Sequence, residues 1–174
     1  MAVSIYLAFM LLSIHQFPET QEKLSTNDDE YFNMFVQEVR RYYPFFPFLG
    51  ARVRRSFIWN DLYFKKGALT LLDLYATNHD ASIWEEPNKF MPERFKNRQE
   101  NPFDFIPQGG GDYWLGHRCA GEGATIKIMK TSLKFMVNEM SYDMPKQDYS
   151  YSFVSIPSIP KSKLILTNVR RCQA

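Results

Sequence analysis

The chain of 174 residues is 45% hydrophobic, which is long and apolar enough to bury one sizeable core. A formal net charge of +2, without a long basic block or an acidic tail, argues against nucleic-acid binding. Two cysteines without a Cys-x-x-Cys pair exclude a disulfide framework and the usual zinc spacing, and we expect a reducing, cytoplasmic setting.

The first expected element is a buried helix over residues 2–14, which are almost wholly apolar. This stretch lacks the basic region and the small-residue cleavage site of a signal peptide. His15, Gln16 and Pro18 end it well short of the length that spans a membrane, so we predict no transmembrane segment. The helix would open at the first residue without a cap, as expected for a piece of a longer element.

An amphipathic helix is predicted over residues 25–43. Phe32, Phe35 and Val39 recur at helical spacing, polar residues at 27–29 can cap its start, and Pro44 ends it. Between residues 57 and 75, apolar runs are separated by Asn-Asp and Lys-Lys-Gly turns. These signals predict short strands of one small antiparallel sheet.

Helical periodicity returns over residues 122–140, where the face opposite the apolar stripe carries Lys127, Lys130 and Lys134. We expect a solvated face there, and a docking stripe for a redox partner is the alternative. Over residues 151–169, β-branched runs broken by prolines predict hairpin strands at a sheet edge. Without an internal repeat or a long linker, the chain is predicted to form one continuous α+β unit.

Cys119 ends a glycine-rich loop, QGGGDYWLGHRC, directly before the last predicted helix. The amides at a helix N-terminus favour a thiolate, which can attack an electrophile or ligate a soft metal centre. A buried cysteine that acts as a small apolar side chain is the alternative. Six of the eight glycines lie at 109–111, 116, 121 and 123, as expected where backbone lies against a large flat ligand. A nucleophilic cysteine would not require that flatness.

Three motifs in this order resemble the cytochrome P450 family of haem-thiolate enzymes. The loop at 105–121 is similar to the family's cysteine-ligand loop, EVRR at 38–41 to its Glu-x-x-Arg helix, and MPERF at 91–95 to its Pro-Glu-Arg-Phe segment. The resemblance extends over nearly the entire chain. It implies an α+β, mostly helical fold, with small antiparallel sheets, in which residues 1–174 are the single C-terminal, haem-ligating part. Cys119 would then be the axial ligand of the iron of haem b.

The same resemblance implies a structural network of Glu38, Arg41 and Arg94. Glu38 and Arg41 are three residues apart and therefore share one helix face. The guanidinium of Arg94 can complete a buried set in which each charge is paired and hydrogen-bonded. Such a network would hold the segment that supports the cysteine loop.

Departures from the common ligand loop point to one branch of the family. Asp112, Leu115 and His117 stand where the usual loop carries Phe, Gly and Arg, and QGGGD precedes them. Together with QEVRRYYPFFPFLGA, these features resemble the fatty-acid peroxygenases. In that branch, hydrogen peroxide replaces oxygen, NADPH and a redox partner, and a long-chain fatty acid is hydroxylated at its α or β carbon or decarboxylated.

The resemblance also implies how the substrate is held. In the branch, an Arg-Pro pair anchors the fatty-acid carboxylate, which then serves as the acid-base group that splits peroxide. Residues 1–12 resemble the helix just after that pair, so the arginine is expected upstream of Met1 and no residue of this chain matches it.

Further pocket and cofactor-binding residues follow from the resemblance. An apolar wall beside the haem is expected from Phe45, Phe46 and Pro47, for which a plain core cluster is the alternative. Contacts with the haem propionates or the thiolate are expected from Gln108, His117 and Arg118. His15 and His79 are interpreted as structural.

Three functions remain open at this point. The first is a fatty-acid peroxygenase, complete or truncated. The second is a conventional monooxygenase supplied with electrons by a redox partner, and the third is a non-catalytic, truncated remnant that binds haem or has only a structural role.

Overall fold

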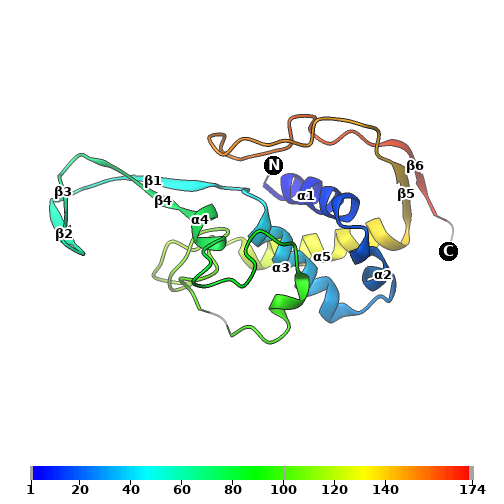
Figure 1. Cartoon of the computed structure of the whole chain (residues 1–174), viewed down its shortest axis with the longest axis horizontal. Coiled ribbons are helices and arrows are strands. Elements are labelled where there is room, and N and C mark those ends of the chain that lie inside the picture. The colour runs from blue at the N-terminus through cyan, green and yellow to red at the C-terminus, as the bar shows by residue number, and fades with distance from the viewer. Residues whose placement is uncertain (1, 100, 173–174) are drawn as a thin grey trace.

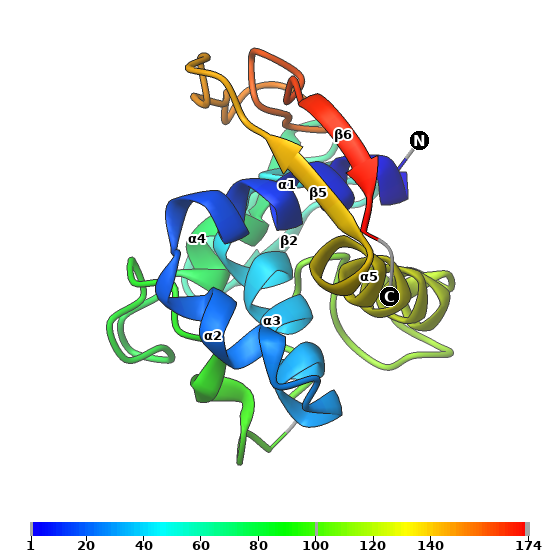
Figure 2. The ribbon, with the colours of Figure 1, turned by 90° about the vertical axis from the view of Figure 1, so that its right-hand side faces the viewer.

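The computed structural model describes residues 2–99 and 101–172 of the chain. Its body is built from the helices α1 (Ala2–Gln16), α2 (Glu19–Ser25), α3 (Asp29–Tyr42) and α5 (Glu122–Asn138). A short helix α4 (Leu74–Asn78) and the 3₁₀ turn η1 (Pro92–Phe95) lie in the segment between α3 and the cysteine loop. Figures 1 and 2 show α1, α3 and α5 crossing in the centre of the molecule, with small sheets at its periphery. This arrangement confirms the predicted α+β, mostly helical class.

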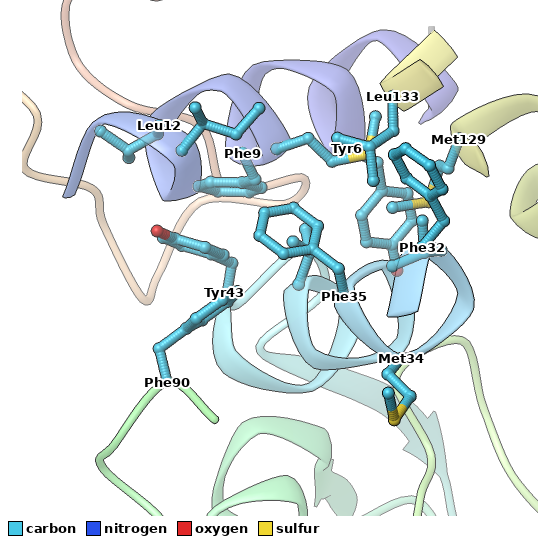
Figure 3. Close-up of a cluster of buried hydrophobic side chains, with 14 of the residues drawn as sticks. Tyr6, Phe9, Leu12, Phe32, Met34, Phe35, Tyr43, Phe90, Met129 and Leu133 are labelled. Atoms are coloured by element: carbon cyan, nitrogen blue, oxygen red, sulfur yellow. The ribbon is translucent and has the colours of Figure 1, made fainter. Parts of the chain in front are cut away.

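The core lies where α1, α3 and α5 meet (Figure 3). The rings of Phe9 and Tyr43 stack with centroids 4.6 Å apart, and Tyr6 packs against Phe45 at 4.2 Å. Each fully buried side chain of this kind contributes about 1.5–3 kcal/mol to folding. The apolar N-terminal stretch is therefore a core helix, as predicted, although Met1 lies outside the described residues. Among the described helices, no segment is both long and apolar enough to cross a membrane.

The predicted amphipathic helix over 25–43 is confirmed as α3, which begins within the polar stretch at 27–29 that was expected to cap it. Asp28 is the cap, because its carboxylate accepts a hydrogen bond from the Glu30 N–H at 3.0 Å. Asn27 adopts a left-handed conformation with φ of 57°, which separates α3 from the preceding helix α2. The short helix α2 itself was not predicted.

The single predicted sheet over residues 57–75 is two separate two-stranded sheets. Strand β1 (Phe48–Arg52) pairs antiparallel with β4 (Leu69–Asp73), and β2 (Phe57–Trp59) pairs with β3 (Leu62–Phe64). The Asn60–Asp61 turn is confirmed, with both residues at positive φ as a tight hairpin requires. Sequence analysis missed β1 because FLGAR shows no alternation of apolar and polar residues. The β2–β3 hairpin projects away from the helices (Figure 1).

The C-terminal region contains less strand than predicted. Helix α5 ends at Asn138, and the next residues form β5 (Met140–Asp143), which pairs antiparallel with β6 (Thr167–Arg171). Between them, the predicted hairpin over 151–169 is wrong except where β6 begins, because residues 151–166 form only an isolated bridge between Tyr151 and Pro160. Proline cannot donate to a strand ladder, so PSIP disrupts pairing.

Candidate functional site

The cysteine loop folds back on its own backbone. Gly109 has φ of +91°, and a Cβ there would lie only 1.9 Å from the carbonyl oxygen of His117. At Gly116, a Cβ would lie 2.6 Å from the Asp112 oxygen. These glycines are therefore required by contacts within the loop. The expectation that they make room for a flat ligand is not needed to explain them.

Cys119 is held through its main chain at the start of α5. Its N–H donates to the carbonyl of Gln108 at 3.0 Å, and its carbonyl accepts from the N–H of Glu122 at 3.1 Å. Its side chain is exposed and forms no disulfide. The N-cap of α5 is Gly121, which has no side chain to occupy the helix N-terminus. The N-terminal end of α5 therefore lies beside the thiol.

An apolar pocket of about 160 Å³ opens beside this thiol. Its lining is Phe45, Phe46, Leu49, Leu74, Gln108, Gly109 and Cys119. Three expected residues do not line it. Pro47 instead accepts hydrogen bonds from the N–H groups of Leu74 and Tyr75, His117 is exposed, and Arg118 contacts Glu122.

The donor set at this pocket fits a metal that is held mainly by a prosthetic group. Among the described residues, no cluster of three or more His, Cys, Asp or Glu side chains could hold a metal ion. A single thiolate beside aromatic walls, however, suits a macrocycle that supplies the other ligands and needs apolar contact on its ring. The residues present are therefore compatible with haem.

A buried ion-pair network lies between α3 and the segment that precedes the cysteine loop. Both nitrogens of the Arg41 fork donate to the two oxygens of Glu38 at 2.8 Å, and Glu38 and Arg41 are fully buried. Arg94 lies 3.2 Å from the same carboxylate. The structure thus brings the three predicted residues together. The remaining donors of the two arginines bind main-chain carbonyls of Asn78, Glu85, Glu86, Pro87 and Lys89.

This network attaches α3 to the segment that precedes the cysteine loop. The Met91 N–H also donates to Glu38 at 2.8 Å, so the carboxylate receives main-chain as well as side-chain donors. Asn78, whose carbonyl binds Arg41, accepts from the N–H of Ile106 through its side chain at 3.0 Å. The network is therefore connected to the beginning of the loop through one asparagine.

Sequence analysis missed a second buried network, formed by Arg40 and Glu122. Arg40 donates to Glu122, whose other oxygen accepts from Arg118, and Arg40 also donates to the Gln108 side chain at 3.2 Å. Its guanidinium lies 5.2 Å from the ring centroid of Phe105. The only sequence signal was a second arginine beside Arg41, and nothing local indicates that its partner lies 82 residues away.

The lysine face of α5 is not simply solvated. Lys130 and Lys134 donate to the two oxygens of Asp29, at 2.5 and 2.7 Å, and thereby connect α5 to the first residue of α3. These hydrogen bonds lower the pKa of Asp29 to about 2. Lys127 is exposed. Lys130, Lys134 and Asp29 all stay partly exposed, so they form a surface ion-pair cluster on the face that was expected to be solvated.

Comparisons with known proteins match this architecture. The sequence model of the family described as Cytochrome P450 matches residues 2–162. A mitochondrial cytochrome P450 4e5 of Drosophila mettleri is 27% identical over 149 residues, which are 75% of this chain and 28% of that protein. The chain thus spans under a third of this curated relative.

Two solved structures are more similar. Cytochrome P450EX alpha with myristic acid is 53% identical with a TM-score of 0.87, over 98% of this chain and 41% of that one. A variant of cytochrome P450 OleT in complex with arachidonic acid is 42% identical with a TM-score of 0.88, over 99% of this chain and 41% of that one. Both structures contain fatty acids.

Proposed function

The chain belongs to the cytochrome P450 family, and we propose that residues 1–174 are the haem-ligating part of a fatty-acid peroxygenase. Cys119 would supply the thiolate that holds the iron of haem b. The observation that carries this proposal is the exposed thiol of Cys119 beside a pocket walled by Phe45 and Phe46, at the N-terminus of α5. The fatty acids in two structures at 53% and 42% identity support the substrate class.

The residues of this chain have separable roles in that function. The start of α5 places the sulfur of Cys119 at the pocket, and Phe45 and Phe46 keep water from that side of the pocket. The Glu38 network holds the 78–94 segment on which the loop depends. The chemistry that haem supplies when bound here is peroxide activation, helped by electron density from the thiolate.

Hydrogen peroxide is the proposed co-substrate, and no redox partner is obligatory. One peroxide oxygen enters a C–H bond of the fatty acid, and the other leaves as water. The acid-base group is the substrate's own carboxylate. The resemblance of the ligand loop to the peroxygenase branch, at Asp112, Leu115 and His117, supports peroxide over a redox partner.

Haem ligation is tested with the reduced carbon monoxide complex, which absorbs at a distinctive wavelength when a thiolate is the ligand. The chain is supplied with haem, alone and as a hybrid in which it replaces the matching 41% of cytochrome P450EX alpha. We expect the thiolate signature, its loss in Cys119→Ala and its retention in Cys172→Ala, which alters the other exposed cysteine. A hybrid that folds but never gives the signature would refute the proposal.

Electron supply is tested with the same hybrid and myristic acid. Hydroxylated product with hydrogen peroxide alone supports the peroxygenase. Product that requires NADPH and a reductase supports the conventional monooxygenase instead. Haem-loaded protein that makes no product under either condition supports the non-catalytic remnant.

A further inference from the structure

Glu122 receives a guanidinium on each of its carboxylate oxygens. Arg40 from α3 donates to Oε1, and Arg118 from the cysteine loop donates to Oε2. Glu122 is the first residue of α5, and it is buried together with Arg40. One carboxylate thus joins three segments: the helix α3, the cysteine loop and the helix that follows the loop.

These contacts hold the backbone of Cys119 at two points. First, Arg118 directly precedes Cys119 and is bound by Glu122. Second, Gln108 accepts the Cys119 N–H with its carbonyl and the Arg40 guanidinium with its side chain. Arg40 therefore contacts, through Glu122 and Gln108, both groups that fix the main chain around the thiol.

The network also places formal charges near Cys119. It contains two guanidiniums, and Glu122 supplies the carboxylate that both of them contact. Arg40 is almost fully buried, where charges are screened less than at the surface. The buried pair of Glu38 and Arg41 cannot replace this network, because its contacts are to the 78–94 segment.

We propose that Glu122, bridging Arg40 and Arg118, is a positioning residue that fixes the Cys119 loop for haem ligation and sets the reduction potential of the bound iron. The inference rests on the proposed function, because it requires Cys119 to be the ligand. Glu122 acts through its neighbours. Residues that orient a metal ligand in this way typically change metal affinity by roughly 10–100-fold when they are replaced.

The test uses three variants of the haem-loaded hybrid. Two are the single variants Glu122→Gln and Glu122→Asp, and the third is a double variant that combines Arg40→Met and Glu122→Leu. The double variant removes the buried charges together, which protects folding if Glu122→Gln alone leaves Arg40 uncompensated. Asp29→Asn is the matched control, because it also neutralises a carboxylate that binds α5. Readouts are haem affinity, the thiolate signature of the carbon monoxide complex and the reduction potential, measured on samples with wild-type circular dichroism.

Glu122→Gln is expected to weaken haem binding roughly tenfold or more and to shift the potential in the positive direction. The added positive charge favours the iron state that carries the extra electron. The double variant is expected to weaken binding without the potential shift, since it removes one charge of each sign. Glu122→Asp is expected to keep the potential and recover part of the affinity.

Two results would overturn the inference while the proposed function stands. One is a folded Glu122→Gln variant with unchanged haem affinity, signature and potential. The other is the same shift in Asp29→Asn, because the effect would then be a general response to charge. A wild-type hybrid without any thiolate signature would overturn both the proposed function and this inference.

Discussion

Glu38 and Arg41 form a fully buried, two-pronged ion pair one helical turn apart on α3, with both nitrogen–oxygen distances at 2.8 Å. Because the pair is buried, breaking it leaves an uncompensated charge in the interior. We expect Glu38→Gln to lower the free energy of unfolding by about 3–5 kcal/mol, measured by urea denaturation.

The control for that variant is Glu86→Gln. Glu86 and Lys89 are also three residues apart and form an ion pair at 3.2 Å, but both side chains are more than half exposed. Exposed pairs contribute about 0–1 kcal/mol. Equal losses in the two variants would contradict the interpretation that burial makes the Glu38 pair important.

Alanine substitutions at Gly109, in the cysteine loop, and at Gly67, outside it, distinguish the cost of steric overlap from the cost of backbone strain. Both have positive φ, but a Cβ at Gly67 meets nothing within 4 Å, whereas a Cβ at Gly109 would lie 1.9 Å from the His117 oxygen. Gly67→Ala is expected to cost about 1–2 kcal/mol of stability from left-handed strain. Gly109→Ala is expected to cost about 1–3 kcal/mol more.

Thermal unfolding of both glycine variants measures this difference. If the haem-ligation proposal is also correct, Gly109→Ala reduces the thiolate signature and Gly67→Ala does not. Similar losses of stability in the two variants would argue against the tight fold of the loop.

Asp29 is expected to make the free energy of unfolding depend on pH in the acidic range. Hydrogen bonds from Lys130 and Lys134 lower its pKa from 3.8 to about 2, so the folded state releases this proton more readily than the unfolded state. The stabilising contribution is therefore complete above about pH 4 and is lost as the pH falls toward 2. Asp29→Asn removes it at neutral pH and flattens this part of the profile. Urea denaturation at a series of pH values measures both effects, and a parallel displacement of the profile would contradict them.

His79 should affect stability at milder pH. Burial, with help from the nearby Arg41, lowers its pKa from 6.5 to about 4, and its Nδ1 lies 3.0 Å from the Tyr75 carbonyl. The unfolded state therefore binds a proton first as the pH falls. The contribution of neutral His79 to the free energy of unfolding is fully present above about pH 6.5 and is lost as the pH falls toward 4. The variant His79→Phe keeps an aromatic ring that can stack on Tyr75 and removes the group that titrates.

Two measurements check the histidine. A nuclear magnetic resonance titration of the folded protein is expected to show a His79 midpoint near pH 4. His79→Phe is expected to make stability less dependent on pH between 6.5 and 4, and an unchanged slope would show that another group is responsible.

The sequence by itself determined what depends on neighbours along the chain. Helical spacing predicted α3 and α5, because 3.6-residue periodicity is a local property, and an almost wholly apolar run predicted α1. The Glu38 and Arg41 pair was predictable because three residues separate the partners on one helix. The loop before α5 was recognisable from the order of residues around Cys119. Strand β1 shows the limit, since FLGAR has no alternation of apolar and polar residues and becomes a strand only by pairing with β4.

Only the tertiary structure decided which distant charges meet. Arg40 and Glu122 are 82 residues apart, and Asp29 and Lys130 are 101 apart, so no local pattern pairs them. Each pair forms because α3 and α5 pack together in the core, which places side chains of both helices within reach of each other. Hydrophobic burial brings the helices together, but it has no direction. Close packing of the side chains therefore fixes how the helices lie relative to each other. That placement determines which charged residues meet the cysteine loop.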